Sequence, residues 1–157
     1  MISPEVLRRF PFFAGFDESQ LKALSMVAEE RTIEAHNTIF EEGTPAEKFY
    51  LLIDGSVDLY IKSEQENIPS ARREFSVGEI NPGEVFGINA LLEPYKHGFT
   101  ERAGPVCSII EFDGASLRAL IEIDQSFGYR LLVQVAKTLM ERLYSTRMPF
   151  LPSLLMS

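Results

Sequence analysis

The chain has 157 residues, 45% of them hydrophobic and 24% charged, which is the composition of one folded domain and excludes a disordered segment. The formal net charge of −8 opposes binding to the phosphate backbone of a nucleic acid, so we expect no nucleic-acid partner. No apolar run is long enough for a membrane span, the N-terminus does not resemble a signal peptide, and the single cysteine, Cys107, forms no intrachain disulfide, which together predict a cytoplasmic protein.

Residues 1–30 are predicted to be helical. Asp17 is suited to be an N-cap, and Gln20 follows three residues later, as in a capping box. An apolar stripe at roughly helical spacing comes next and consists of Leu21, Leu24, Met26, Val27 and Ala28. The phenylalanines that precede the stripe, which we expect to pack the helix onto the core, are Phe10, Phe12, Phe13 and Phe16.

Residues 31–113 show a different pattern, in which short runs of β-branched and aromatic residues are separated by turn residues. Many short strands at such spacing are typical of an all-β sandwich or barrel. Asp54 and Gly55 separate two apolar runs and predict a hairpin, and the polar residues 63–73 predict a second, solvent-exposed hairpin tip. The predicted strands are residues 38–40, 49–53, 57–61, 74–77 and 108–112.

Helical periodicity returns at residue 114, with a short helix predicted at residues 116–123 and a long one at residues 125–147. The apolar stripe of the long helix is broader than packing on one sheet requires, which favours a homodimer in which the helix packs against its copy. The alternative is a helix buried wholly on its own domain. The residues expected at the dimer contact are Leu132, Val135, Leu139 and Leu143. Residues 148–157 contain two prolines and large apolar side chains, and we expect them to dock on the domain, its dimer mate or a protein partner.

Two stretches of the β region carry a specific motif. They read IFEEGTPA at residues 39–46 and FYLLIDGSV at residues 49–57. Together with the flanking helices, they resemble cyclic-nucleotide-binding domains, which occur in catabolite activator protein, in regulatory subunits of protein kinase A and in gated channels.

The resemblance covers residues 7–143, and it implies a mainly β fold, an eight-stranded jelly roll (a double-stranded β-helix) with N-terminal helices and a long C-terminal helix. We therefore divide this single domain into an N-terminal helical segment (1–30), a ligand-binding barrel (31–113), C-terminal helices (114–147) and an apolar tail (148–157).

In this family a short cassette holds the cyclic nucleotide. It begins Phe-Gly-Glu, continues through one helical turn and ends at an arginine followed by two small residues. The glycine admits the phosphate, the amides of the turn and the arginine bind it, and the glutamate accepts a hydrogen bond from the ribose. By resemblance, the candidate ligand-binding residues here are Phe86, Gly87, Ile88, Asn89, Ala90, Leu91, His97, Gly98, Phe99 and Thr100. Arg142 and Leu143 of the long helix are candidates for the base side of a ligand.

The cassette departs from the family at three positions. Ile88 replaces the glutamate and cannot accept a hydrogen bond, His97 replaces the arginine, and Phe99 is bulky where a small residue is expected. Arg102 is an alternative phosphate ligand, but it would need a longer gap after the helical turn and would lie on the other face of a strand. Losing the glutamate and arginine contacts removes roughly 3–6 kcal/mol, or about 10²–10⁴ in affinity, of which a protonated His97 would restore part.

These departures predict a non-enzymatic regulatory or sensor domain with altered or lost cyclic nucleotide binding that signals through its C-terminal helix. A dimerisation or adaptor module that binds no nucleotide is one alternative, and the effector domain of a transcription regulator is another, although residues 144–157 leave no room for a helix-turn-helix domain. We find no catalytic motif and expect no cofactor beyond an anionic ligand of the cassette. His36, His97 and Cys107 are too few to predict a metal site.

Overall fold

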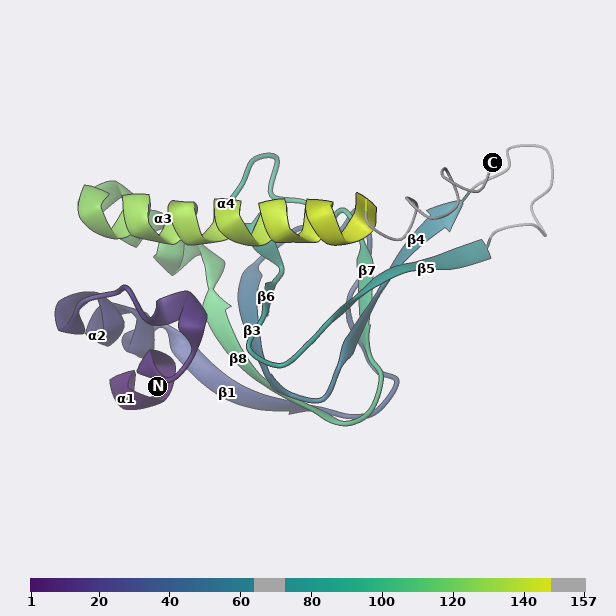
Figure 1. The fold of residues 1–157 in the computed structure, drawn as a ribbon, viewed down its shortest axis with the longest axis horizontal. Helices are drawn as coiled ribbons and strands as arrows, with labels where there is room; N and C mark the ends of the chain where they lie inside the picture. The colour runs from purple at the N-terminus through teal and green to yellow at the C-terminus, as the bar shows by residue number, and fades with distance from the viewer. Residues whose placement is uncertain (64–72, 148–157) are drawn as a thin grey trace.

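The computed structural model describes residues 1–63 and 73–147, and in these residues eight strands form two four-stranded antiparallel sheets that close into a β-roll (Figure 1). The first sheet has the order β1 (Ala28–Ile33), β8 (Cys107–Asp113), β3 (Lys48–Asp54) and β6 (Val85–Phe86). The second has the order β2 (Thr38–Phe40), β7 (Thr100–Ala103), β4 (Val57–Ser63) and β5 (Arg73–Ile80). The mainly β jelly-roll fold expected from the sequence is therefore confirmed.

The N-terminal helices cover the outer face of the first sheet. They are α1 (Pro4–Arg8), the 3-10 helix η1 (Pro11–Phe13) and α2 (Glu18–Met26). The predicted capping box is confirmed, because the Asp17 carboxylate accepts from the Gln20 amide and the Gln20 side chain accepts from the Asp17 amide. The phenylalanine cluster also packs as expected, with the Phe13 ring 5.6 Å from the ring of Phe112 on β8.

The predicted apolar stripe of α2 is wrong at its C-terminal end. Met26 is 73% exposed, and Ala28 is the first residue of β1 and not part of the helix. The sequence analysis missed β1 because its residues between Ala28 and Ile33 are all exposed and polar, so the strand shows no apolar alternation.

The hairpin predicted at Asp54 and Gly55 is wrong. β3 pairs with β6 and β8, whereas β4 pairs with β5 and β7, so this turn carries the chain from one sheet to the other. Gly55 has φ +98°, and a Cβ there would lie 2.8 Å from the Cys107 Sγ. The second predicted hairpin forms between β4 and β5, and its tip lies outside the described residues.

Two helices follow β8. α3 (Gly114–Ile123) is short, and α4 (Gln125–Arg147) runs along one side of the molecule from the N-terminal helices to the roll (Figure 1). The buried side chains of α4 are Phe127, Leu131 and Val135, which join the cluster between the helices and the first sheet. No helix within the described ranges is long and apolar enough to cross a membrane. The apolar tail, residues 148–157, lies outside them.

Candidate functional site

The cassette begins where β6 ends. Gly87 adopts a left-handed conformation with φ +68° and precedes a one-turn 3-10 helix, η3 (Ile88–Ala90). A Cβ at Gly87 would lie 2.7 Å from Tyr50 Cδ2 and 2.9 Å from the Lys48 carbonyl oxygen. Glycine is therefore required both for the backbone conformation and for the close approach to β3.

The C-terminal end of η3 is held by α3. The Arg118 guanidinium donates a hydrogen bond to the Ala90 carbonyl and lies 4.4 Å from the centre of the Tyr95 ring. The sequence offered no signal for this contact, since Arg118 is one polar residue on a predicted helix. It connects the cassette mechanically to the C-terminal helices.

His97 lies inside the structure and not at its surface. Its side chain is 5% exposed and stacks on Phe40, with ring centres 3.5 Å apart and planes 8° apart. Burial lowers the pKa of His97 to about 4, so the imidazole is neutral at physiological pH. A pKa of about 4 therefore does not agree with the expectation that a protonated His97 replaces the arginine charge near pH 6.

The other unusual cassette residues have different environments. Ile88 is buried in the cluster between the helices and the first sheet, whereas Phe99 is 39% exposed and so does not fill the cassette. Thr100 is fully buried, and its hydroxyl accepts a hydrogen bond from the Glu42 amide at 3.0 Å. The Phe86 ring stacks on Tyr50 inside the roll, with ring centres 4.8 Å apart. Of the remaining candidates, Ala90 and Leu91 are buried, Asn89 is half-buried and Gly98 is exposed.

Arg102, the alternative phosphate ligand, lies on the outer surface of the second sheet. Its guanidinium forms an ion pair with Glu74 on β5, donates to the Thr38 hydroxyl at 3.1 Å and lies 5.0 Å from the Tyr60 ring centre. These contacts direct it away from the roll interior. The assignment of His97, and not Arg102, to the arginine position stays a prediction.

A buried carboxyl group that the sequence analysis missed lies beside the cassette. Glu101 on β7 is 4% exposed and lies opposite Leu59 of β4, which is buried in the roll interior. Burial raises the pKa of Glu101 to about 8, an effect that the positive charge of Arg142 partly opposes. Glu101 Oε2 has no hydrogen-bond partner among residues 1–63 and 73–147.

Arg142 is the residue by which α4 reaches the roll. Its guanidinium donates to the carbonyl oxygen of Val85, directly before the cassette, and its charge acts on Glu101. Leu143, its expected companion on the base side, is 55% exposed. The sequence alone could not distinguish these neighbours, because both lie near the edge of the buried face of the helix.

Of the four α4 residues expected at the dimer contact, three are exposed and one is buried. Val135 is 2% exposed and packs inside its own domain, so it cannot contact a second copy. Leu132, Leu139 and Leu143 are 38%, 44% and 55% exposed, and with the exposed Ala136 they recur at four- and three-residue intervals along one face. We refer to Leu132, Ala136, Leu139 and Leu143 as the α4 seam.

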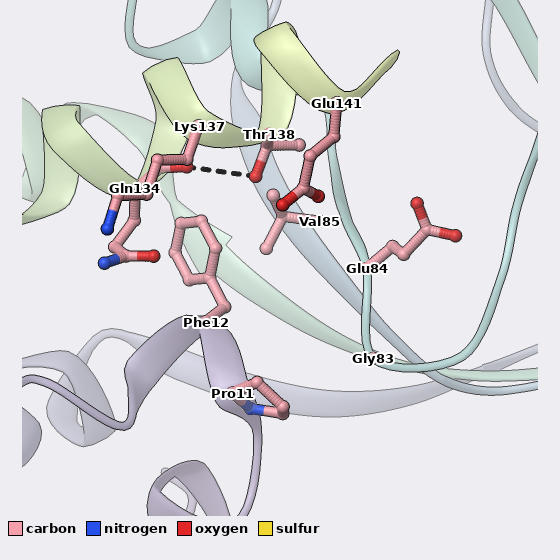
Figure 2. A pocket seen from close by; sticks show the side chains of 9 residues that line it. All are labelled: Pro11, Phe12, Gly83, Glu84, Val85, Gln134, Lys137, Thr138 and Glu141. Atoms are coloured by element: carbon pink, nitrogen blue, oxygen red, sulfur yellow. Dashed lines mark hydrogen bonds between the residues drawn. The ribbon is translucent and has the colours of Figure 1, made fainter. Parts of the chain in front are cut away.

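A cavity of about 190 Å³ lies between η1, the chain before β6, and α4 (Figure 2). Phe12 extends from η1 toward α4, where the Thr138 hydroxyl donates to the Gln134 carbonyl at 3.0 Å. The lining residues are Pro11, Phe12, Gly83, Glu84, Val85, Gln134, Lys137, Thr138 and Glu141. The cavity lies beside Val135, the residue by which this stretch of α4 packs on the domain.

Comparison with known proteins connects this geometry to a family. Residues 30–124 match the cyclic nucleotide-binding domain family. The chain belongs to this family. A crystal structure described as a cyclic nucleotide-binding protein from Geobacter metallireducens superimposes with a TM-score of 0.80 and 33% sequence identity, over 91% of this chain and 99% of that one.

Two groups of curated relatives extend the comparison. The cAMP-activated global transcriptional regulator CRP of Escherichia coli is 28% identical over 104 residues, which are 66% of this chain and 47% of the relative. The cAMP-dependent protein kinase regulatory subunit of Mycosarcoma maydis is 25% identical over 114 residues, 69% of this chain and 22% of the relative. The chain thus spans less than half the length of these relatives.

Proposed function

We propose that this cyclic nucleotide-binding domain is a non-enzymatic regulatory module with altered ligand preference, in which occupancy of the roll interior changes the position of α4. The observation that carries the proposal is the contact of Arg142 with Val85. Through it, the last helix reaches the start of the cassette and a buried carboxyl group in the roll. A ligand that binds there has to change this contact.

The altered preference follows from the charges around the cassette. His97 is neutral, Ile88 is an apolar core residue, and Arg102 is paired with Glu74 outside the roll. A cyclic phosphate would therefore meet none of the charged contacts that each contribute roughly 1.5–3 kcal/mol. We infer a reduced affinity for cAMP.

Signalling through α4 requires two helix positions with different ligand affinities, because a ligand shifts only an equilibrium between states that it binds unequally. Two features support such movement. The cavity lined by Gln134 and Glu141 separates one face of this part of α4 from η1 and the chain before β6. Arg118 connects the cassette turn to α3, the helix before α4.

Calorimetric titration with cAMP, cGMP and cyclic dinucleotides, at pH 6 and pH 8, tests the proposal together with hydrogen exchange of α4 amides. We expect binding of at least one nucleotide, and no gain in cAMP affinity from His97 at pH 6, because the imidazole is neutral at both pH values. We also expect the α4 amides near Arg142 to change their exchange rates. Absence of heat with every nucleotide, from a folded protein, would contradict the proposal.

We further propose that the domain forms a homodimer through the α4 seam, whose spacing is that of a two-helix contact. Replacing Leu139 by glutamate should convert the dimer to a monomer, measured as a halved mass by light scattering, since two like charges would face each other across an apolar contact. The exposed Lys137, outside the seam, gives the control variant Lys137→Glu, which should remain dimeric. A monomeric wild-type protein would refute the dimer.

The seam also favours a second candidate function, a protein-interaction or adaptor module that keeps the fold without binding a nucleotide. Exposed apolar residues in a regular pattern on one helix face are typical of a contact surface. The similarity to the regulator CRP supports a third, the effector domain of a transcription regulator. The calorimetric titration distinguishes these functions, because an adaptor module of this kind binds no nucleotide.

A further inference from the structure

A carboxyl group is enclosed among apolar side chains of the roll. Glu101 pairs with Leu59 on one side and Phe40 on the other, and its side chain shares the interior face of the second sheet with theirs. The groups of the first sheet that form the opposite wall include Tyr50 and Phe86. A charged residue type at such a position is rare unless its oxygens are bound.

The described residues do not provide hydrogen-bond partners for both oxygens of the Glu101 carboxyl group. Glu101 Oε2 is buried without a hydrogen-bond partner in the described part of the chain, although almost all buried polar atoms in native proteins have one. Burial raises the pKa of Glu101, and the positive charge of Arg142, on α4, opposes that rise. A carboxyl oxygen that is buried in a residue only 4% exposed, with no partner among the described residues, points to a ligand that completes its hydrogen bonding.

Flat aromatic surfaces lie next to Glu101. Phe40 lies roughly parallel to Tyr50, at 25° and 5.9 Å between ring centres, and Tyr50 lies parallel to Phe86, at 11° and 4.8 Å. Aromatic rings of this kind stack with planar heterocycles, and a carboxylate with two acceptor oxygens matches an edge with two adjacent N–H donors.

We propose that Glu101 is a specificity-determining residue that accepts hydrogen bonds from a planar ligand edge with two adjacent N–H donors, such as the N1–H and 2-amino groups of guanine. The inference rests on the proposed ligand-binding function of the roll. Adenine presents a lone pair at N1 and would place an acceptor against the ionised carboxylate, whereas two N–H donors stabilise the ionised form. Guanine-type cyclic nucleotides are therefore preferred over adenine-type ones when Glu101 is ionised. The edge of the bound base then takes the place of Arg142 beside Glu101. Because Arg142 belongs to α4, recognition of the base changes a contact of this helix.

The test compares cGMP, cAMP and inosine 3′,5′-cyclic monophosphate, which lacks the 2-amino group, by calorimetric titration of the whole chain at pH 8.5, where the carboxyl group is ionised. For the wild type we expect cGMP to bind at least about 10-fold more tightly than cAMP, with the inosine nucleotide between them. Glu101→Leu should remove the preference, because it lowers the affinity for cGMP and leaves the affinity for cAMP unchanged. Glu101→Gln keeps the size of the side chain and should reduce the preference without unfolding the domain. The exposed Glu79 on β5 gives the control Glu79→Gln, which should retain it.

Equal affinities of the wild type for cGMP and cAMP would overturn the inference, and so would a preference that survives in both Glu101 variants. Either result leaves the proposed function intact, because cAMP or cGMP still binds. Absence of binding of all three nucleotides to the folded wild type would overturn the inference and the nucleotide part of the proposed function together.

Discussion

Replacing His97 by arginine should raise the affinity of the domain for cAMP by about 10- to 100-fold, because one charge-assisted hydrogen bond contributes roughly 1.5–3 kcal/mol. The backbone around this position already holds the cassette shape, since the His97 amide donates to the Thr44 carbonyl and its carbonyl accepts from Gly43. A planar guanidinium can also stack on Phe40 in place of the imidazole. Calorimetric titration with cAMP measures the gain.

Lys96→Arg is the matched control, since Lys96 is exposed and already charged, and this variant should bind cAMP like the wild type. Thermal unfolding of the His97→Arg protein shows whether the larger side chain is tolerated. A folded His97→Arg variant with unchanged affinity would show that the missing arginine is not what limits cAMP binding.

The free energy of unfolding should depend strongly on pH through Glu101. Its pKa is raised from an ordinary value near 4.5 to about 8 in the folded protein, so the stability that its neutral form contributes is present below pH 4.5 and is lost as the pH rises toward 8. Glu101→Gln cannot ionise. The variant should therefore gain stability relative to the wild type between pH 5 and pH 8, by on the order of 4 kcal/mol.

Urea unfolding of both proteins at pH 5, 6.5 and 8 measures this difference, with the exposed Glu79→Gln as control. His97 acts in the opposite direction in all three proteins. Its pKa is lowered to about 4, so the stability from its neutral form is present above pH 6.5 and is lost as the pH falls toward 4. Parallel stability curves for the wild type and Glu101→Gln would mean that Glu101 is ionised in the folded protein throughout this range.

The elements that depend on local sequence could be predicted. The capping box of Asp17 and Gln20 and the long helix α4 formed as expected, because capping and helical periodicity act over neighbouring residues.

The features that depend on closing the two sheets could not be predicted. Asp54 and Gly55 have the residue types of a hairpin turn, and only the pairing of β3 and β4 with other strands shows that they join different sheets. Likewise, the burial of Glu101 results from where β7 lies, since its direct neighbours in the sequence, Thr100 and Arg102, are polar. The apolar stripe of α4 includes the buried Val135 and the exposed Leu139, and periodicity alone does not say which residues of a broad stripe face the core.

The place of β8 in the first sheet has a consequence for how the chain folds during synthesis. β8 lies between β1 and β3, and its pairing joins Ala28 to Phe112 and Lys48 to Asp113. Until residue 113 has been synthesised, β1 therefore lacks its one partner strand and β3 lacks one of its two neighbours, so the first sheet cannot be completed. Such late, non-local pairing slows folding and leaves strand edges open to other nascent chains, so the cell has to protect this domain until most of it has been translated.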